Sequence, residues 1–281
     1  MNRRRVNKAF GLLSKTAAVI CSSILLFLFA IIFVKGSAAI NLDFIFTASE
    51  NFGADGGILY QLIGSVILII TTAIIVFPLG LGLAIFKSEY IKSSKLQKIT
   101  TTLLYILNGI PSVIFGIFGL IFFVNQLNTG ISWLVGSIIL AIMILPTVCI
   151  TSYHSLNAVP SIYRESGLAL GYNKEQVIKK ILIPKSIKGA ITGLLLGLAR
   201  AIGETAPVMF IATAFSGVEI PSSIYDPVAT LPTHILALSQ QATNPDALNN
   251  AWGASLILII LTISFSFTAL FIRIRHKNSN I

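Results

Sequence analysis

The sequence predicts an all-α, polytopic integral membrane protein with six transmembrane helices. Hydrophobic residues make up 55% of the 281 residues and charged residues only 11%, whereas an ordinary soluble domain has about 25% charged residues. Six apolar stretches are long enough to cross a bilayer, which takes about 20 helical residues. The basic residues lie in every second segment between these stretches, as expected when alternate segments face opposite sides of a membrane.

The predicted transmembrane domain covers residues 16–272, between a basic arm at 1–15 and a tail at 273–281. Long apolar windows indicate membrane-spanning helices, so spans are expected at 16–34, 62–86, 101–124, 134–153, 189–215 and 254–272. Prolines fall inside three of these spans, where each predicts a kink, namely Pro78, Pro111 and Pro146.

The first span could also be a secretory signal peptide, since Ser37, Ala38 and Ala39 resemble a small-residue cleavage site. Its apolar stretch of about 19 residues exceeds the roughly 7–15 residues usual in a signal peptide. We therefore expect this stretch to remain as a membrane helix.

The charges of the connecting segments predict the orientation. Eighteen of the 20 Lys and Arg residues lie in the arm, the tail, the 87–100 loop and the 154–188 loop. The other side of the predicted membrane holds Lys35 and six carboxylates. Since cytoplasmic segments carry an excess of Lys and Arg, both termini and both loops are expected in the cytoplasm. The net charge of +10 thus indicates orientation, because so few charges cannot coat a nucleic-acid-binding surface.

The sequence lacks the motifs of common catalytic sites. It has no Gly-x4-Gly-Lys-Ser/Thr nucleotide loop, no His-Glu-x-x-His zinc pair and no Gly-x-Ser-x-Gly nucleophile turn. His154, His234 and His276 lie in separate segments, and Cys21 and Cys149 lie in separate apolar runs, so neither a metal site nor a cofactor is expected. A membrane hydrolase is the least supported alternative.

Arg200 and Glu204 are the only ionisable residues expected deep in a span, where a charge costs about 2.5–3.5 kcal/mol. Their i, i+4 spacing places both side chains on one helix face, where each partly neutralises the other. Gly189, Gly193 and Gly197 share this face and form a small-residue stripe that lets another helix approach closely. The pair is expected to face protein or a water-filled path. It is either an ion pair that locks two helices together or an anion-handling site on a translocation path, since a guanidinium suits phosphate-like oxyanions.

The long cytoplasmic loop is predicted to hold two short amphipathic helices. Ser161 can cap the first helix, and Gly171 can end it in a left-handed turn. Asn173 and Gln176 are spaced as a capping box for the second helix, which Pro184 is expected to stop. Such an element could lie among lipid headgroups or dock into a groove on a cytoplasmic partner.

Residues 159–184 of this loop resemble the EAA loop of ABC-importer permeases. Glu165, Gly171 six residues later and the ending Ile181-Leu182-Ile183-Pro184 match its spacing, although Ser166 and Gly167 stand where the family has two alanines. This resemblance implies the fold of a type I importer permease, whose loop carries a coupling helix that seats in a groove of the ATPase subunit. The residues implied in ATPase coupling are Glu165, Gly171, Ile181 and Pro184.

Further segments, within roughly residues 60–272, resemble the phosphate-importer permeases. The resemblance rests on the run from Gly109 to Gly119 and on the run Arg200-Ala201-Ile202-Gly203-Glu204-Thr205-Ala206-Pro207. The ending Glu-Thr-Ala-Pro is similar to that of PstA-type subunits. By this resemblance Arg200, Glu204 and Thr205 line the substrate pathway.

The resemblance also implies a non-catalytic, multi-pass subunit in the plasma membrane of a bacterium or archaeon. Its implied partners are a homologous PstC-type permease, a cytoplasmic ABC ATPase dimer that hydrolyses the ATP, an extracytoplasmic phosphate-binding protein, inorganic phosphate and membrane lipid. A permease for another oxyanion, such as sulfate or molybdate, is the alternative within this class. A membrane sensor or scaffold protein is the alternative outside it.

Overall fold

The computed structural model describes residues 3–213, 220–241 and 243–278. Within these ranges, five helices are long and apolar enough to cross a membrane, and a bent pair of helices can form a sixth span. The predicted all-α, polytopic membrane class is therefore confirmed. The last residues of the predicted fifth span (214–215), the first two of the arm and the last three of the tail lie outside the described residues.

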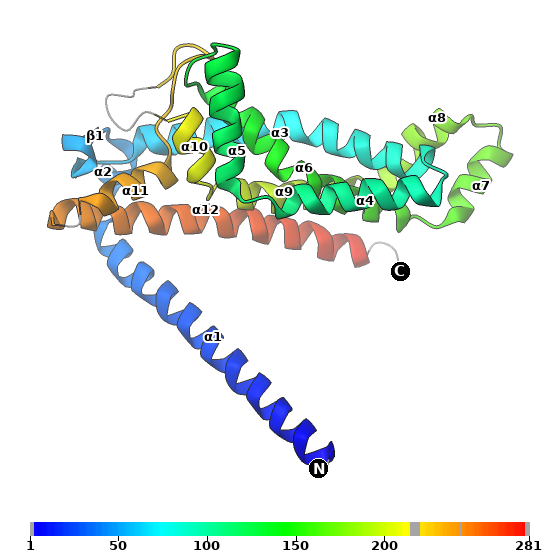
Figure 1. The fold of residues 1–281 in the computed structure, drawn as a ribbon, viewed down its shortest axis with the longest axis horizontal. Helices are drawn as coiled ribbons and strands as arrows, with labels where there is room; N and C mark the ends of the chain where they lie inside the picture. Colours follow the sequence, from blue (N-terminus) through cyan, green and yellow to red (C-terminus); the bar gives the residue numbers. More distant parts are fainter. Residues whose placement is uncertain (1–2, 214–219, 242, 279–281) are drawn as a thin grey trace.

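The fold consists of helices and one small hairpin (Figure 1). The helices are α1 (Arg3–Ala39), α2 (Leu42–Phe46), α3 (Leu59–Ile85), α4 (Ser94–Gly109), α5 (Ser112–Gly119), α6 (Trp133–Asn157), α7 (Ser161–Ala169), α8 (Lys174–Val177), α9 (Ile183–Ala201), α10 (Ala206–Ile211), α11 (Leu231–Gln240) and α12 (Pro245–Asn278). Three π-helical turns continue α3, α5 and α8, at Phe86–Tyr90, Leu120–Gln126 and Ile178–Leu182. The antiparallel strands β1 (Ser49–Glu50) and β2 (Asp55–Gly56) flank a 3-10 turn at Asn51–Gly53.

The hydrophobic core lies where α3, α6 and α9 pack together. Val76 of α3, Ile144 and Val148 of α6, and Leu198 of α9 are all buried in one cluster. In the most apolar stretch of α6, 61% of the residues are buried inside the chain. In the most apolar stretch of α1, no residue is buried. α6 is therefore the central helix, and α1 presents its apolar side chains outward, as a lipid-facing helix does.

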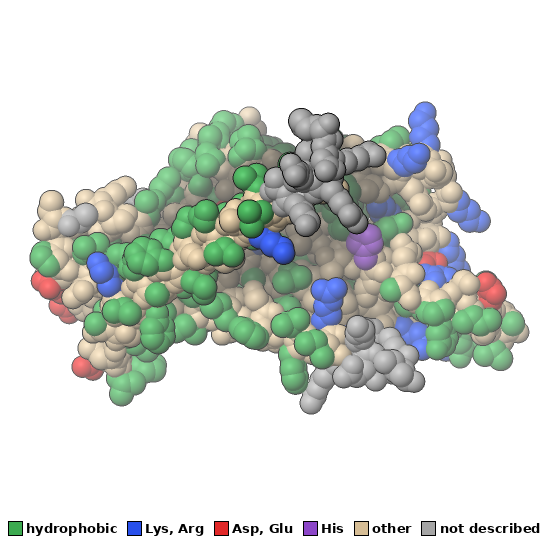
Figure 2. Space-filling model, turned by 90° about the horizontal axis from the view of Figure 1, so that it is seen from below, with side chains coloured by type: hydrophobic (Ala, Val, Ile, Leu, Met, Phe, Trp, Pro, Cys, Tyr) green, Lys and Arg blue, Asp and Glu red, His purple; other side chains and the backbone are tan. Residues whose placement is uncertain are grey.

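α1 contacts the rest of the chain near its C-terminal end and diverges from it toward the N-terminus (Figure 1). At the contact, Gly36 lies so close to α12 that a Cβ there would be 2.7 Å from the carbonyl oxygen of Trp252. Figure 2 shows most of the visible Lys and Arg side chains gathered toward the end of the molecule that carries α7 and α8, whereas Asp and Glu side chains appear at both ends.

The predicted span at 101–124 is bent sharply at the proline where a kink was expected. α4 and α5, with its π turn, are bent by 88° relative to each other, and the break falls at Ile110 and Pro111. Pro111 disfavours the helical conformation of the residue before it, and Ile110 is extended, with φ −68° and ψ 130°. The kink expected at Pro111 is thus a complete break, whereas Pro78 and Pro146 lie inside continuous helices.

The helices of the structure do not follow the bounds of the predicted fifth span, 189–215, whose last two residues lie outside the described residues. Helical structure runs without interruption from Lys174 to Ala201, so Pro184 does not stop it. A proline clashes with the carbonyl four residues earlier, and the π turn at Ile178–Leu182 widens the helix at that carbonyl. α9 then ends at Ala201, because Gly203 favours helix weakly and Pro207 has no N–H to bond the Gly203 carbonyl.

Candidate functional site

Two helix breaks adjoin on one side of the core. The first separates α4 from α5, and the second separates α9 from α10 at residues 202–205. α5 and α10 pack closely after their breaks, since a Cβ on Gly116 would lie 2.8 Å from the Pro207 Cα. In membrane transporters, broken helices expose backbone and polar groups where a ligand can reach them.

Arg200, at the second break, links the two breaks through its guanidinium. Its Nη1 donates a hydrogen bond to Asn108 Oδ1 over 3.2 Å, and its Nε lies 3.4 Å from Glu204 Oε1. Thr147 of α6 donates to the same Asn108 oxygen over 3.2 Å. The Arg200–Glu204 ion pair expected from the i, i+4 spacing is present, although the helix ends between the two residues.

The guanidinium is open to the surface of the chain. The side chain of Arg200 is 39% exposed and that of Glu204 is 16% exposed. Arg200 Nη2 has no hydrogen-bond partner among the residues that the structure describes. A cation that is held by neutral and acidic neighbours and retains free donors can bind an oxyanion by charge-assisted hydrogen bonds.

Asn108 and Thr147 were missed by sequence reasoning. Asn108 comes directly before the Gly109-Ile110-Pro111 break, and that position is the signal that could have indicated it. Thr147 gave no signal, because a threonine inside an apolar helix usually bonds only to its own backbone.

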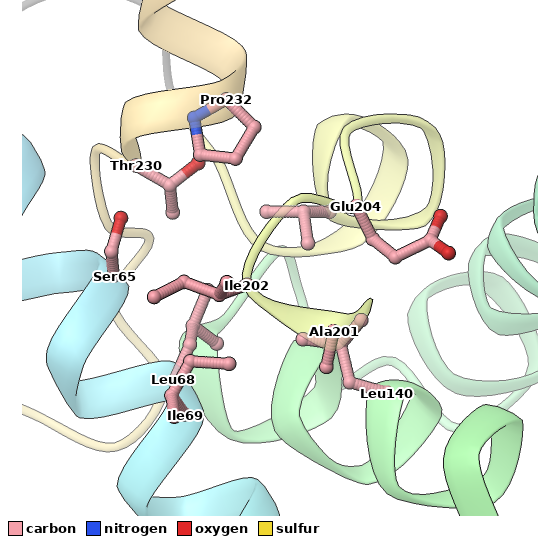
Figure 3. Close-up of a pocket in the computed structure, with 10 residues that line it drawn as sticks. Ser65, Leu68, Ile69, Leu140, Ala201, Ile202, Glu204, Thr230 and Pro232 are labelled. Carbon is pink, nitrogen blue, oxygen red and sulfur yellow. The ribbon is translucent and has the colours of Figure 1, made fainter. Parts of the chain in front are cut away.

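The remaining residues of the second break face elsewhere. Thr205 precedes α10 without a side-chain capping bond and, with Met209, Leu236 and Ser239, lines an open groove beside α11. Figure 3 shows a small cavity on the inner side of the break, with the Glu204 carboxylate pointing away from the two hydroxyls that line it, Ser65 and Thr230. Its volume is about 10 Å³, which is about enough for one water molecule. This cavity is therefore too small for an oxyanion such as phosphate, whereas Arg200 is exposed on the outer side of the break.

The glycine stripe of α9 lies against α6. A Cβ on Gly193 would be 2.6 Å from Thr151 Cβ, and one on Gly189 would be 2.7 Å from Ser155 Cβ. Gly197 has more room, with its nearest neighbour, Val148 Cγ2, at 3.3 Å. Such short separations let two helix backbones approach closely and hold α9, with Arg200 at its end, in a defined register against α6.

The cytoplasmic loop contains α7, α8 and the following π turn, residues 161–182, here called the coupling segment. The predicted capping box is present, because Asn173 and Gln176 bond reciprocally to each other's backbone N–H. Gly171 has a φ of +82°, which is the predicted left-handed turn. The prediction that Ser161 caps α7 is wrong, since Pro160 occupies the cap position and no side chain caps the helix.

The residues implied in ATPase coupling lie on different sides of this segment. Glu165 and Gly171 are exposed, and so is Pro184 just beyond the segment, whereas Ile181 is partly buried. A Cβ on Gly167 would be 2.7 Å from Ile181 Cδ1, so α7 packs directly on the π turn. Leu170 is 78% exposed at the tip, and the segment thus presents an apolar, basic knob to whatever lies beside it.

The fold is that of a helical membrane permease subunit. Over residues 76–277 the chain matches the family described as "Binding-protein-dependent transport system inner membrane component", and it belongs to this family. Membership implies an ATPase and a substrate-binding protein as partners and the plasma membrane as location.

Curated relatives are similar over nearly their whole length. The probable ABC transporter permease protein YqgI of Bacillus subtilis is 33% identical over 96% of this chain and 95% of its own. The phosphate transport system permease protein PstA of Haemophilus influenzae is 33% identical over 98% of this chain and 96% of its own. PstA of Pasteurella multocida is 33% identical over 86% of both chains.

Solved structures share the fold at low identity. A bacterial ABC transporter involved in the import of the acidic polysaccharide alginate matches with a TM-score of 0.65 and 16% identity, over 98% of this chain and 99% of that one. The MetNI methionine ABC transporter, in an inward-facing conformation, matches with a TM-score of 0.58 and 17% identity. The match covers 77% of this chain and 93% of that one. These likenesses confirm the predicted type of fold.

Proposed function

We propose that the chain is a PstA-type permease subunit of an ATP-driven phosphate importer and forms half of its translocation pathway. The observation that carries this proposal is the exposed Arg200 guanidinium, held by Asn108 and Glu204 where two broken helices adjoin. The names of the PstA relatives support phosphate as the transported anion.

Arg200 binds phosphate through its free donors, and Glu204 limits the affinity so that the anion also leaves. Arg200 and Asn108 are both exposed on the surface of the chain, which supports a second subunit that completes the pathway. We assign that role to a homologous PstC-type permease, whose surface lies opposite Arg200 and excludes lipid from the anion.

The coupling segment docks a cytoplasmic dimer of ABC ATPases, which hydrolyse the ATP on their own subunits. The gathering of Lys and Arg at this end of the molecule supports a cytoplasmic location for it and for both termini (Figure 2). The extracytoplasmic phosphate-binding protein then delivers its ligand at the opposite end.

A single helical run joins the docking surface to the anion site. The run from Lys174 to Ala201 has 28 residues, so at about 1.5 Å per residue it spans about 40 Å. Closure of the ATPases displaces α8, and the same rigid element carries the displacement to Arg200. The pathway thereby alternates between outward-open and inward-open states.

Uptake into vesicles that hold the reconstituted complex tests this proposal. Labelled phosphate should accumulate only with ATP and binding protein, and unlabelled phosphate should compete far better than sulfate or molybdate. Preferential competition by sulfate or molybdate would identify a permease for that oxyanion instead. Assembly of the complex without uptake of any of the three would favour a sensor or scaffold.

A further inference from the structure

The π turn Phe86–Tyr90, which continues α3 toward the cytoplasmic loop, is attached to the coupling segment. The side chains that make this attachment are not used by the anion site. The π turn contributes Ser88, Glu89 and Tyr90 to these contacts. A π turn interrupts the regular hydrogen-bond pattern of a helix, and such interruptions occur frequently at functional positions.

The central contact is an ion pair between Arg164 of α7 and Glu89. Arg164 Nε and Nη2 both donate to Glu89 Oε1, over 3.2 and 3.0 Å. The same guanidinium donates to the carbonyl oxygens of Val159 and Leu156, over 2.9 and 3.1 Å, at the C-terminal end of α6. One side chain therefore joins α7, α3 and α6.

This ion pair is sheltered from water. The Arg164 side chain is 23% exposed and the Glu89 side chain is 12% exposed. A solvated surface pair contributes little because water and salt screen it. Here the hydrogen bonds to two carbonyls and the low exposure hold the geometry in place.

Two further contacts strengthen the same junction. Lys174 of α8 donates to the Glu89 carbonyl oxygen, and its ammonium lies 3.9 Å from the centroid of the Tyr90 ring. Ser88 donates to Asn157 Oδ1 at the end of α6 over 3.0 Å. Both helices of the coupling segment thus contact α3 directly.

We propose that Arg164 and Glu89 are positioning residues that make the coupling segment move as one body with the cytoplasmic end of α3. This inference rests on the proposed function, in which ATPases displace the coupling segment. α9 follows that displacement because it continues the α8 helix. α3 is a separate helix, and it is connected to the segment by these polar contacts and by the apolar cluster in which Ala84 packs with Val177, Ile178 and Leu182. The ion pair therefore carries the movement into a second core helix.

Distance measurements between spin labels on the assembled transporter test this proposal. Labels replace Lys92, just after α3, and Lys179 of the coupling segment, which are both exposed. The distance should be the same in the nucleotide-free and ATP–vanadate-trapped states of the otherwise native complex. In Glu89→Gln it should increase and broaden on trapping, and in the matched control Glu175→Gln, an exposed glutamate of α8, it should not. A distance that changes in the native complex, or stays constant in Glu89→Gln, would overturn the proposal.

A second measurement separates coupling from mere stabilisation. In Glu89→Gln the number of ATP molecules hydrolysed per phosphate imported should rise by about threefold or more. Glu89→Asp keeps a carboxylate for the Arg164 guanidinium, and it should hold this ratio closer to the native value than Glu89→Gln does. If ATP hydrolysis and uptake instead fall in proportion, the pair only stabilises the fold and the proposal is wrong.

The two measurements also distinguish this proposal from the assignment of phosphate. If the native complex imports no phosphate, the proposed function fails, but the label distances still decide whether Arg164 and Glu89 hold the coupling segment to α3. If Glu89→Gln assembles poorly, Ser88→Ala is the second variant. It keeps both charges and removes the contacts of the Ser88 hydroxyl with Glu89 and Asn157, and it should shift the label distance in the same direction by less.

Discussion

Arg200 and Asn108 are 92 residues apart in the sequence, yet the guanidinium Nη1 lies 3.2 Å from the amide Oδ1. Asn108 is the last residue but one of α4 and Arg200 is the last but one of α9, and a proline follows each helix end, Pro111 in one case and Pro207 in the other. Each helix stops at its break, so neither side chain is followed by a further turn of its own helix. The two breaks bring a cation and an amide together on an open surface.

Replacing Arg200 by Gln should reduce labelled phosphate uptake by at least about tenfold, because a charge-assisted hydrogen bond to the anion is lost. The amount of assembled complex should stay the same, since the side chain is 39% exposed and is not part of the core. Arg273→Gln, an exposed arginine of α12, is the control. Normal uptake by the Arg200 variant would rule out its role in the pathway.

Asn108→Asp should raise the KM for phosphate uptake about tenfold or more. The new carboxylate would lie beside the Arg200 guanidinium and repel the incoming anion, whereas Asn108→Ala, which only removes a hydrogen bond, should have a smaller effect. Asn125→Asp adds the same charge at an exposed position after α5 and should leave KM unchanged. If the Asp and Ala variants have equal KM values, charge at this position does not matter.

Gly193→Ala should lower the thermal stability of the detergent-solubilised chain. The added Cβ would meet Thr151 Cβ at 2.6 Å, so α9 and α6 would have to separate, at a cost of about 1–3 kcal/mol. Gly82→Ala on α3, where no atom lies within 4 Å, is the control and should be neutral or slightly stabilising. The midpoint temperature of aggregation measures both, and equal midpoints would contradict the close α6–α9 contact.

His234 should make the fold sensitive to acid. Burial lowers the pKa of His234 from its usual 6.5 to about 4. In the unfolded chain His234 therefore binds a proton as the pH falls through 6.5. In the folded chain the His234 ring stays neutral down to about pH 4. The free energy of unfolding should decrease by up to about 3 kcal/mol over this range.

Thermal unfolding at pH 7.5 and pH 4.5 checks this prediction. His234→Gln should lose less stability between the two pH values than the native chain, and the exposed control His154→Gln should lose as much as the native chain. An equal loss in all three proteins would assign the acid sensitivity to other groups.

Gly171→Val should reduce co-purification of the ATPase with the permease. The residue has a φ of +82°, and a side chain there costs about 1–2 kcal/mol or turns α8 away from α7. Gly130→Val imposes the same strain at a φ of +72° in a loop outside the coupling segment, and it should leave co-purification intact. Undiminished co-purification of the Gly171 variant would count against docking through this segment.

Local features of the fold were predictable. Each membrane helix is a long apolar run whose partition into lipid depends on its own residues, and the capping box of Asn173 and Gln176 involves neighbours three residues apart. The breaks were predicted less well. Pro78 and Pro146 remain inside helices while Pro111 interrupts one, because neighbouring helices decide whether a helix can continue past a proline.

The sequence by itself determined the membrane class, the contrast between basic and acidic segments, and the pairing of Arg200 with Glu204, since all of these depend on hydropathy, charge and short spacing. Only the tertiary structure decided that Asn108 and Thr147 join Arg200, and that Arg164 binds Glu89 of α3. These contacts connect residues that are distant in the sequence. They exist because close packing of α3, α6 and α9, permitted by glycines such as Gly193, brings the ends of separate helices within hydrogen-bond distance.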